Sequence, residues 1–305
     1  MSAPGTRRAA GAQPALPETA GPVQAVLRWL CDPRPTACAP PAQDFSPLGA
    51  VLEGAIDAKL VCMLADRLLH GRLDVDLSRP MHSFLARTLR ANAQHAHLHR
   101  GEAVRIVQAL TRLGVPVAVL NGLAYDTGLY PPGGLRQFTD IDLLVDPADR
   151  EAALGLLAEL GFAERGRGAH TRRRPTGDAL TPAISVDVAT ILGHTADPAD
   201  VRAALARAHT VEPPHAGEQL PVLARADALR HALARLATRP RWTSVADAAR
   251  LALTSPNQPP AAPEKPLPTQ AHTGWAVLRT YLPDLPPHPP VTAAPRSPGR
   301  AERAR

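Results

Sequence analysis

The feature that most constrains the fold is a pair of aspartates at the start of an apolar run, Asp140-Ile-Asp142-Leu-Leu-Val. The segment 137–145 predicts a buried strand. Because alternate side chains of a strand point to the same face, Asp140 and Asp142 are expected to project together. Ile141 and Leu143 then face the opposite, buried side. Two carboxylates so close repel each other unless a cation lies between them.

Two further apolar segments predict strands beside this one. Residues 115–120 form a short, almost wholly apolar run that ends at Asn121-Gly122, which indicates a buried strand and a tight turn. Residues 184–192 form another, with Asp187 near its middle. An acid inside a strand is costly unless it is paired or bound to a metal. An isolated D-x-D triplet is common in solvated loops and predicts little by itself. Here the acids lie in apolar strands, and this setting predicts that the three carboxylates form one anionic cluster.

The remaining segments predict helices and irregular ends. Helical spacing of apolar residues favours helices at about 47–70 and 80–113, followed by further helices after the third strand. We expect an α+β fold, a small mixed β-sheet flanked by N-terminal and C-terminal helices, with disordered Pro-rich ends. The expected regions are a mostly disordered leader with one short helix (1–44), an N-terminal helical region (45–114), an α/β core (115–210), a C-terminal helical region (211–255) and a mostly disordered Pro/Arg-rich tail with a short helix at 273–281 (256–305).

Composition narrows the setting and the partners. The formal net charge is +6, which permits an RNA, nucleotide or acidic partner without showing one. The three cysteines form no C-x-x-C pair, so neither a disulfide framework nor a zinc site is expected, and a reducing cytosol is favoured. No apolar run has the length of a membrane span, and the N-terminus lacks the apolar core of a signal peptide. We therefore expect a cytoplasmic protein with no membrane partner.

Two weaker patterns have plain interpretations. His95, His97 and His99 form an H-x-H-x-H run, and we interpret it as the polar face of a solvated helix rather than a metal site. The arginines of segment 165–174 predict a basic loop between two site strands. That loop is either solvated or in contact with phosphate or RNA.

Taken together, the segment 115–162 resembles the nucleotidyltransferase superfamily, and specifically the bacterial group of uncharacterised nucleotidyltransferases. Three pieces carry the resemblance: Val-Ala-Val-Leu-Asn121-Gly122-Leu-Ala, Leu-Arg136-Gln-Phe-Thr-Asp140-Ile-Asp142-Leu-Leu-Val, and Val-Asp187-Val. They look like the group's first strand with its glycine turn, its metal-binding strand and the element bearing the third acid. A later segment, 229–253, is similar to its helical tail.

The resemblance implies roles for the three acids. Asp140 and Asp142 would hold Mg²⁺ (or Mn²⁺) on a nucleoside triphosphate. Asp187 would complete the metal site, as a ligand or as the base that activates the acceptor hydroxyl. The implied reaction is in-line transfer of a nucleoside monophosphate to an acceptor, with release of pyrophosphate. The acceptor itself stays open between a small molecule, a peptide, a protein and an RNA.

The resemblance also implies nucleotide contacts. Backbone N–H groups around Asn121 and Gly122 would bind phosphate at the start of the following helix, and Arg136 would pair with a phosphate oxygen. One departure is notable: the group usually has Lys before the glycine of this turn, and here the residue is Asn121. The loss of that charge supports an alternative, a catalytically degenerate accessory or interaction protein. A basic RNA-binding module is a third hypothesis, which strongly salt-dependent binding would reveal.

Overall fold

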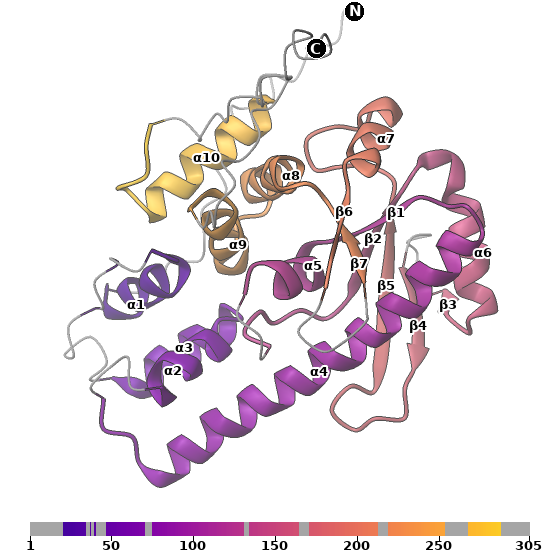
Figure 1. Cartoon of the computed structure of the whole chain (residues 1–305). Coiled ribbons are helices and arrows are strands. Elements are labelled where there is room, and N and C mark those ends of the chain that lie inside the picture. Colours follow the sequence, from indigo (N-terminus) through magenta and orange to yellow (C-terminus); the bar gives the residue numbers. More distant parts are fainter. Residues whose placement is uncertain are drawn as a thin grey trace, which may run out of the picture.

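The computed structural model describes residues 21–34, 37, 40, 47–70, 75–130, 134–164, 171–212, 219–253 and 268–287. Within them helices surround one mixed β-sheet, so the expected α+β class is confirmed (Figure 1). The helices are α1 (Gly21–Cys31), α2 (Leu48–Asp57), α3 (Val61–Leu69), α4 (Arg79–Arg112), α5 (Asn121–Gly128), η2 (Pro147–Asp149), α6 (Arg150–Glu159), α7 (Pro198–Ala206), α8 (Arg225–Thr238), α9 (Trp242–Leu253) and α10 (Thr269–Tyr281). Residues 1–20, segment 165–170 and most of the expected tail lie outside the described residues.

The strands of the sheet follow the order β3-β4-β5-β2-β1-β7-β6. They are β1 (Val117–Leu120), β2 (Ile141–Val145), β3 (Ala163–Glu164), β4 (Thr171–Pro175), β5 (Ala183–Ala189), β6 (His209–Val211) and β7 (Leu220–Val222). The central strand β2 pairs antiparallel with β1 and parallel with β5. This register puts Asp142 directly opposite Asp187 on β5 and opposite Leu120 at the end of β1.

Burial along the central strands explains why an apolar sequence forms them. Every residue of β1 is buried, and so is every residue of β2 except Asp142. On β5 burial alternates, with Ile184, Val186 and Val188 buried and the face that carries Asp187 partly open. The sheet is therefore a core element whose only open patch along β2 is at the acids.

The single helix expected at 47–70 is wrong, because two helices occupy that segment. Helix α2 ends where Lys59 adopts a left-handed backbone conformation with φ of 56°. The Leu60 N–H donates to the Ala55 carbonyl and the Lys59 N–H to the Ile56 carbonyl, the hydrogen bonds that close a helix C-terminus. This conformation usually requires glycine, so the sequence held no signal for the break.

Helix α4 links the N-terminal helices to the sheet. It runs diagonally across the view of Figure 1, from beside α3 at lower left to the strands at right. Ser78 caps its N-terminus by accepting a hydrogen bond from the Met81 N–H at 3.4 Å, and Gly114, with φ of 74°, follows its C-terminus. The helix expected at 80–113 agrees with these bounds. Among the described residues no helix is both long and apolar enough to cross a bilayer.

The C-terminal part departs from the expected regions in two ways. The sheet continues past residue 210, since β7 pairs parallel with β1 inside the segment expected to be helical. This three-residue strand contains a proline and was too short to be recognised. Helix α10, four residues longer at its start than the helix expected at 273–281, packs against α8. A Cβ at Gly274 would overlap the Leu233 carbonyl, so the two helices approach closely because that residue is glycine.

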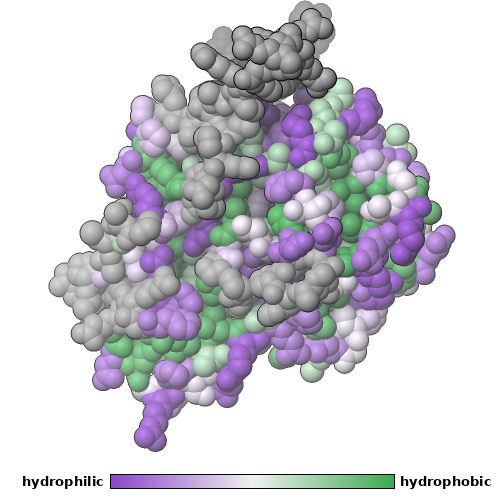
Figure 2. Space-filling model, viewed as in Figure 1, coloured by the Kyte–Doolittle hydropathy of each residue, from purple (hydrophilic) through white to green (hydrophobic). Residues whose placement is uncertain are grey.

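The basic loop expected at 165–174 is partly wrong. Arg172, Arg173 and Arg174 lie on strand β4. Arg172 pairs with Glu164 at 3.2 Å, and Arg174 pairs with Glu102 of α4 at 2.5 Å. Two of these charges therefore join elements of the fold. On the face drawn in Figure 2 hydrophilic residues occupy much of the periphery, with hydrophobic residues visible between them.

Candidate functional site

Three carboxylates meet where β2 and β5 lie side by side. Asp140 precedes β2, Asp142 is its second residue, and Asp187 occupies the matching position on β5. One oxygen from each side chain lies within 4.8 Å of the others, and all three residues are partly buried. The Asp187 Oδ1 atom is buried without a hydrogen-bond partner among the described residues. The three acids expected to share a site are thus brought together.

The electrostatics of this cluster favour a cation. Burial and, after it, the neighbouring charge of Asp140 raise the pKa of Asp142 to about 6. The hydrogen bond from Asn121 and the charge of Arg235 act in the opposite direction. An all-oxygen cluster with an unsatisfied carboxylate oxygen fits a hard divalent cation such as Mg²⁺. The donor set therefore suits the metal that the resemblance implies.

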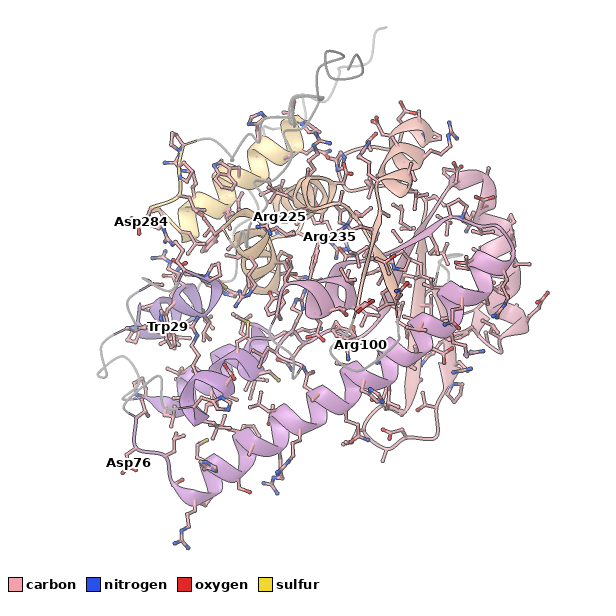
Figure 3. The ribbon with its side chains drawn as sticks, viewed as in Figure 1. Trp29, Asp76, Arg100, Arg225, Arg235 and Asp284 are labelled. Atoms are coloured by element: carbon pink, nitrogen blue, oxygen red, sulfur yellow. The ribbon has the colours of Figure 1, made fainter. Side chains whose placement is uncertain are left out.

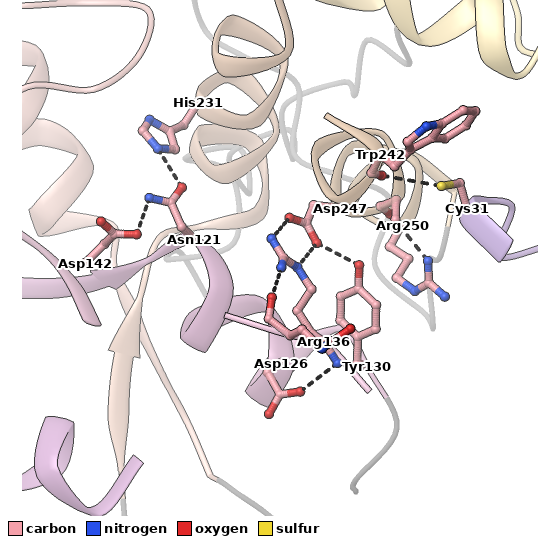
Figure 4. A network of polar contacts seen from close by, with 12 residues as sticks. Cys31, Asn121, Asp126, Tyr130, Arg136, Asp142, His231, Trp242, Asp247 and Arg250 are labelled. Atoms are coloured by element: carbon pink, nitrogen blue, oxygen red, sulfur yellow. Dashed lines mark hydrogen bonds and ion pairs between the residues drawn. The ribbon is translucent and has the colours of Figure 1, made fainter. Parts of the chain in front are cut away.

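Asn121 holds Asp142 in place. Its φ of 53° lies in the left-handed region, where Asn is tolerated better than most residues. Its Nδ2 donates to the Asp142 Oδ2 at 2.7 Å, and its Oδ1 accepts from His231 Nε2 at 3.0 Å (Figure 4). The Gly193 N–H donates to His231 Nδ1 at 2.9 Å, so the ring carries its proton on Nε2. Burial lowers the pKa of His231 to about 3, which keeps this ring neutral.

Arg136 lines the same cavity but is already paired. Its Nε and Nη2 atoms donate to the two carboxylate oxygens of Asp247 at 2.9 and 2.7 Å, and both side chains are buried. The Tyr130 hydroxyl donates to the same Asp247 carboxylate at 2.7 Å (Figure 4). This network joins the segment before Asp140 to helix α9. The role of Arg136 as a nucleotide ligand stays a prediction, and it competes with this ion pair.

The segment before Asp140 is also held from α4, which corrects the interpretation of the histidine run. His99 is fully buried, and His95 donates from Nε2 to the Phe138 carbonyl at 2.9 Å. The two rings lie in contact with centroids 4.0 Å apart and planes tilted by 38°, whereas His97 is exposed. The histidine run alone cannot indicate this burial, because it depends on the distant segment 134–140 packing on the helix. Gly122 meets the same segment, since a Cβ there would overlap the Phe138 side chain.

The carboxylates form one wall of a cavity of about 490 Å³. Asn121, Gly122 and Arg136 also line it, as expected for the predicted site. Four basic residues that the sequence analysis did not single out line it as well: Lys59, Arg235, Arg239 and Arg241. Figure 3 shows Arg235 between α8 and the sheet. The signal available in the sequence was an Arg pair at i and i+4 near a helix end, whose second member begins an Arg-Pro-Arg triplet.

A second hollow, of about 320 Å³, adjoins this cavity at the acids and extends over β4 and β5. Thr139, Asp140 and Asp187 border it, and Thr171, Arg173 and Ser185 line the open face of β4 and β5. Arg173 has no ion-pair partner among the described residues. Asp140 and Asp187 therefore border both a cavity with several basic side chains and a smaller polar hollow.

A mixed sheet whose neighbouring strands present three carboxylates to such a cavity is typical of a domain of the nucleotidyltransferase type. Residues 48–255 match the family described as "Uncharacterised nucleotidyltransferase", and the chain belongs to this family. A solved structure, an antigenic nucleotidyltransferase-like protein from Paracoccidioides brasiliensis, is similar over 61% of this chain and 89% of its own, with 20% identity and a TM-score of 0.44. No curated protein matches the chain.

Proposed function

We propose that this protein is a Mg²⁺-dependent nucleotidyltransferase, which moves a nucleoside monophosphate from a nucleoside triphosphate to an acceptor. The observation that carries the proposal is the cluster of Asp140, Asp142 and Asp187, within 4.8 Å of one another in a cavity that also presents basic side chains. Carboxylates bind a metal ion and cationic side chains bind phosphate, so a cavity that presents both suits a metal–polyphosphate complex. The cavity volume of about 490 Å³ is in the range of small-molecule sites.

Asp140 and Asp142 would hold the metal. Asn121 leaves one oxygen of Asp142 available, because its amide occupies only Oδ2. When bound, Mg²⁺ would neutralise charge on the phosphate oxygens and on the departing pyrophosphate. Asp187, whose Oδ1 has no partner among the described residues, would accept the proton of the acceptor hydroxyl. The acceptor oxygen then bonds to the α-phosphorus, and the bond from that phosphorus to the bridging oxygen breaks.

The acceptor would approach from the second hollow. That hollow opens onto Asp187, the carboxylate proposed as base, and Thr171, Arg173 and Ser185, which line it, do not line the larger cavity. In-line displacement requires the attacking and leaving oxygens on opposite sides of the phosphorus. Separate but adjoining sites for donor and acceptor, both bordered by Asp140 and Asp187, would allow that geometry.

Calorimetry of nucleotide binding tests the proposal. Titrations of the four nucleoside triphosphates, with and without Mg²⁺, would be compared for the wild type and for the Asp140→Asn/Asp142→Asn variant. We expect binding that requires Mg²⁺ and is lost in the variant. Asp76→Asn, an exposed acid that does not line the cavity and lies at the lower left of Figure 3, away from the labelled Arg235, is the matched control and should bind as the wild type does.

A folded wild-type protein that binds none of the triphosphates would contradict the proposal. It would favour the alternative, a catalytically degenerate accessory or interaction protein with the same fold. For an active protein, mass spectrometry of candidate acceptors incubated with the preferred triphosphate would then identify the mass of the transferred nucleotide.

A further inference from the structure

We infer that the phosphates of the donor are bound by the basic wall, defined as Lys59, Arg235, Arg239 and Arg241, and not by the turn at Asn121-Gly122. The inference rests on the proposed function and assigns its polyphosphate subsite. The wall and the acids line the same cavity. A polyphosphate between them would meet cationic side chains on one side and the metal-binding carboxylates on the other.

The wall is built where two helices meet. Arg235 lies in the last turn of α8, and Arg239 follows the helix as its C-cap, where its backbone N–H donates to the Arg235 carbonyl. Arg241 directly precedes α9, and the hydroxyl residues Thr243 and Ser244 of the first turn of α9 also line the cavity. The first turn of a helix leaves backbone N–H groups that suit an anion. The α8–α9 junction therefore presents side-chain cations together with a helix N-terminus.

The charges of the wall are available for a ligand. Within the described part of the chain, none of its four side chains forms an ion pair or a hydrogen bond. By contrast, the other arginine of the cavity, Arg136, is bound at two nitrogens by Asp247. Unpaired like charges that line one cavity repel one another, and a polyanion removes that repulsion.

Lys59 gives a second, independent argument. It holds the left-handed position after α2, with φ of 56°, where glycine would be unstrained. Its side chain contributes nothing to closing the helix, since the closing hydrogen bonds come from backbone N–H groups. The structure therefore carries a strained lysine at the rim of the cavity, which is explained if its charge has a ligand.

The turn at Asn121-Gly122 is poorly suited to the same task. Asn121 brings no charge, and its side chain is occupied at both ends by Asp142 and His231. Phe138 lies against Gly122, so the approach from that side is filled. The basic wall supplies the charge that a lysine at position 121 would have provided.

Calorimetry with Mg·ATP, Mg·tripolyphosphate and AMP tests the inference. Tripolyphosphate carries the phosphates without sugar or base, and AMP lacks the β- and γ-phosphates. We expect Arg235→Ala and Arg239→Ala each to weaken Mg·ATP and Mg·tripolyphosphate about tenfold, which is about 1.4 kcal/mol. AMP affinity should change little. Arg87→Ala, an exposed arginine of α4 that does not line the cavity, is the matched control and should change none of them.

The outcomes separate this inference from the proposed function. If the Arg235→Ala/Arg239→Ala variant binds Mg·ATP as the wild type does, while Asp140→Asn/Asp142→Asn does not, the wall is not the phosphate site and the proposed function stands. If tripolyphosphate binds and requires the arginines but no nucleotide binds, the wall is a polyphosphate site and nucleotidyl transfer is contradicted.

Lys59→Gly provides a readout that a purely structural role cannot give. We expect this variant to unfold at a higher temperature than the wild type, because glycine relieves the left-handed strain, and yet to bind Mg·tripolyphosphate more weakly. A variant that is more stable and binds equally well would remove Lys59 from the wall.

Discussion

The buried pair of Arg136 and Asp247 allows a quantitative test of how the catalytic segment is attached to the C-terminal helices. Only 10% of the Arg136 side chain and 5% of the Asp247 side chain are exposed. Replacing one member leaves the other charge buried without its partner, which costs about 3–5 kcal/mol of unfolding free energy. We therefore expect Arg136→Met to lower the free energy of unfolding by about 3–5 kcal/mol. This is a large share of the roughly 5–15 kcal/mol that stabilises a typical domain.

The double variant Arg136→Met/Asp247→Leu should lose much less than the sum of the single variants. Removing both charges leaves no uncompensated ion. The remaining cost is the Tyr130 hydroxyl without its acceptor, about 1–3 kcal/mol, together with a smaller cost for the part-buried Gln137 carbonyl, which loses the Arg136 donor. Urea unfolding of the wild type, both single variants and the double variant closes a double-mutant cycle. We expect a coupling of at least about 2 kcal/mol.

Arg105→Met is the matched control. Arg105 is 41% exposed, and its partner Glu102 keeps a second ion pair with Arg174. Its loss should cost no more than about 1 kcal/mol. Additive losses for Arg136 and Asp247, or a loss for Arg136→Met as small as the control, would refute the view that this ion pair anchors the segment.

Three further predictions follow from the backbone and the site. Gly134→Ala should lower the free energy of unfolding in urea by about 2–5 kcal/mol, because φ is 73° and the new Cβ would lie 2.7 Å from the Cα of a residue of α4. Its control, Gly177→Ala, has φ of 77° and no neighbour within 4 Å, so it should lower that free energy by only about 1–2 kcal/mol. Equal losses would contradict the packing argument. Gly274→Ala should separate α10 from α8 and speed amide hydrogen exchange in α10; unchanged exchange would argue against the close approach. Asn121→Gly suits the left-handed backbone but removes the donor that lowers the pKa of Asp142, so that pKa should rise above about 6. Binding of Mg²⁺, measured by titration at a series of pH values, should then require a higher pH. An unchanged pH midpoint would show that the hydrogen bond does not tune the site.

Local patterns were sufficient where the structure depends on near neighbours in the chain. The alternation around Asp140 and Asp142 predicted a strand that presents both acids, and Asp187 in an apolar run predicted the strand beside it. Long helices with regular apolar spacing, such as α4, were likewise predicted close to their bounds. In each case burial of one face of a regular element determines the residue pattern, so the element can be predicted from the pattern.

Other features depend on residues far apart in the sequence, and only the tertiary structure decided them. The partner of Arg136 is 111 residues away, and the partner of Asn121 on α8 is 110 residues away, so no local pattern could indicate either contact. Lys59 reaches the cavity because it ends α2 in a left-handed backbone conformation, which a lysine in the sequence does not predict. The sequence by itself determined the acids and the strands that carry them, because strand periodicity is a local property. The basic surface opposite the acids arises only when the helices from both ends of the chain pack around the sheet, since charge complementarity across a cavity is a property of the folded chain.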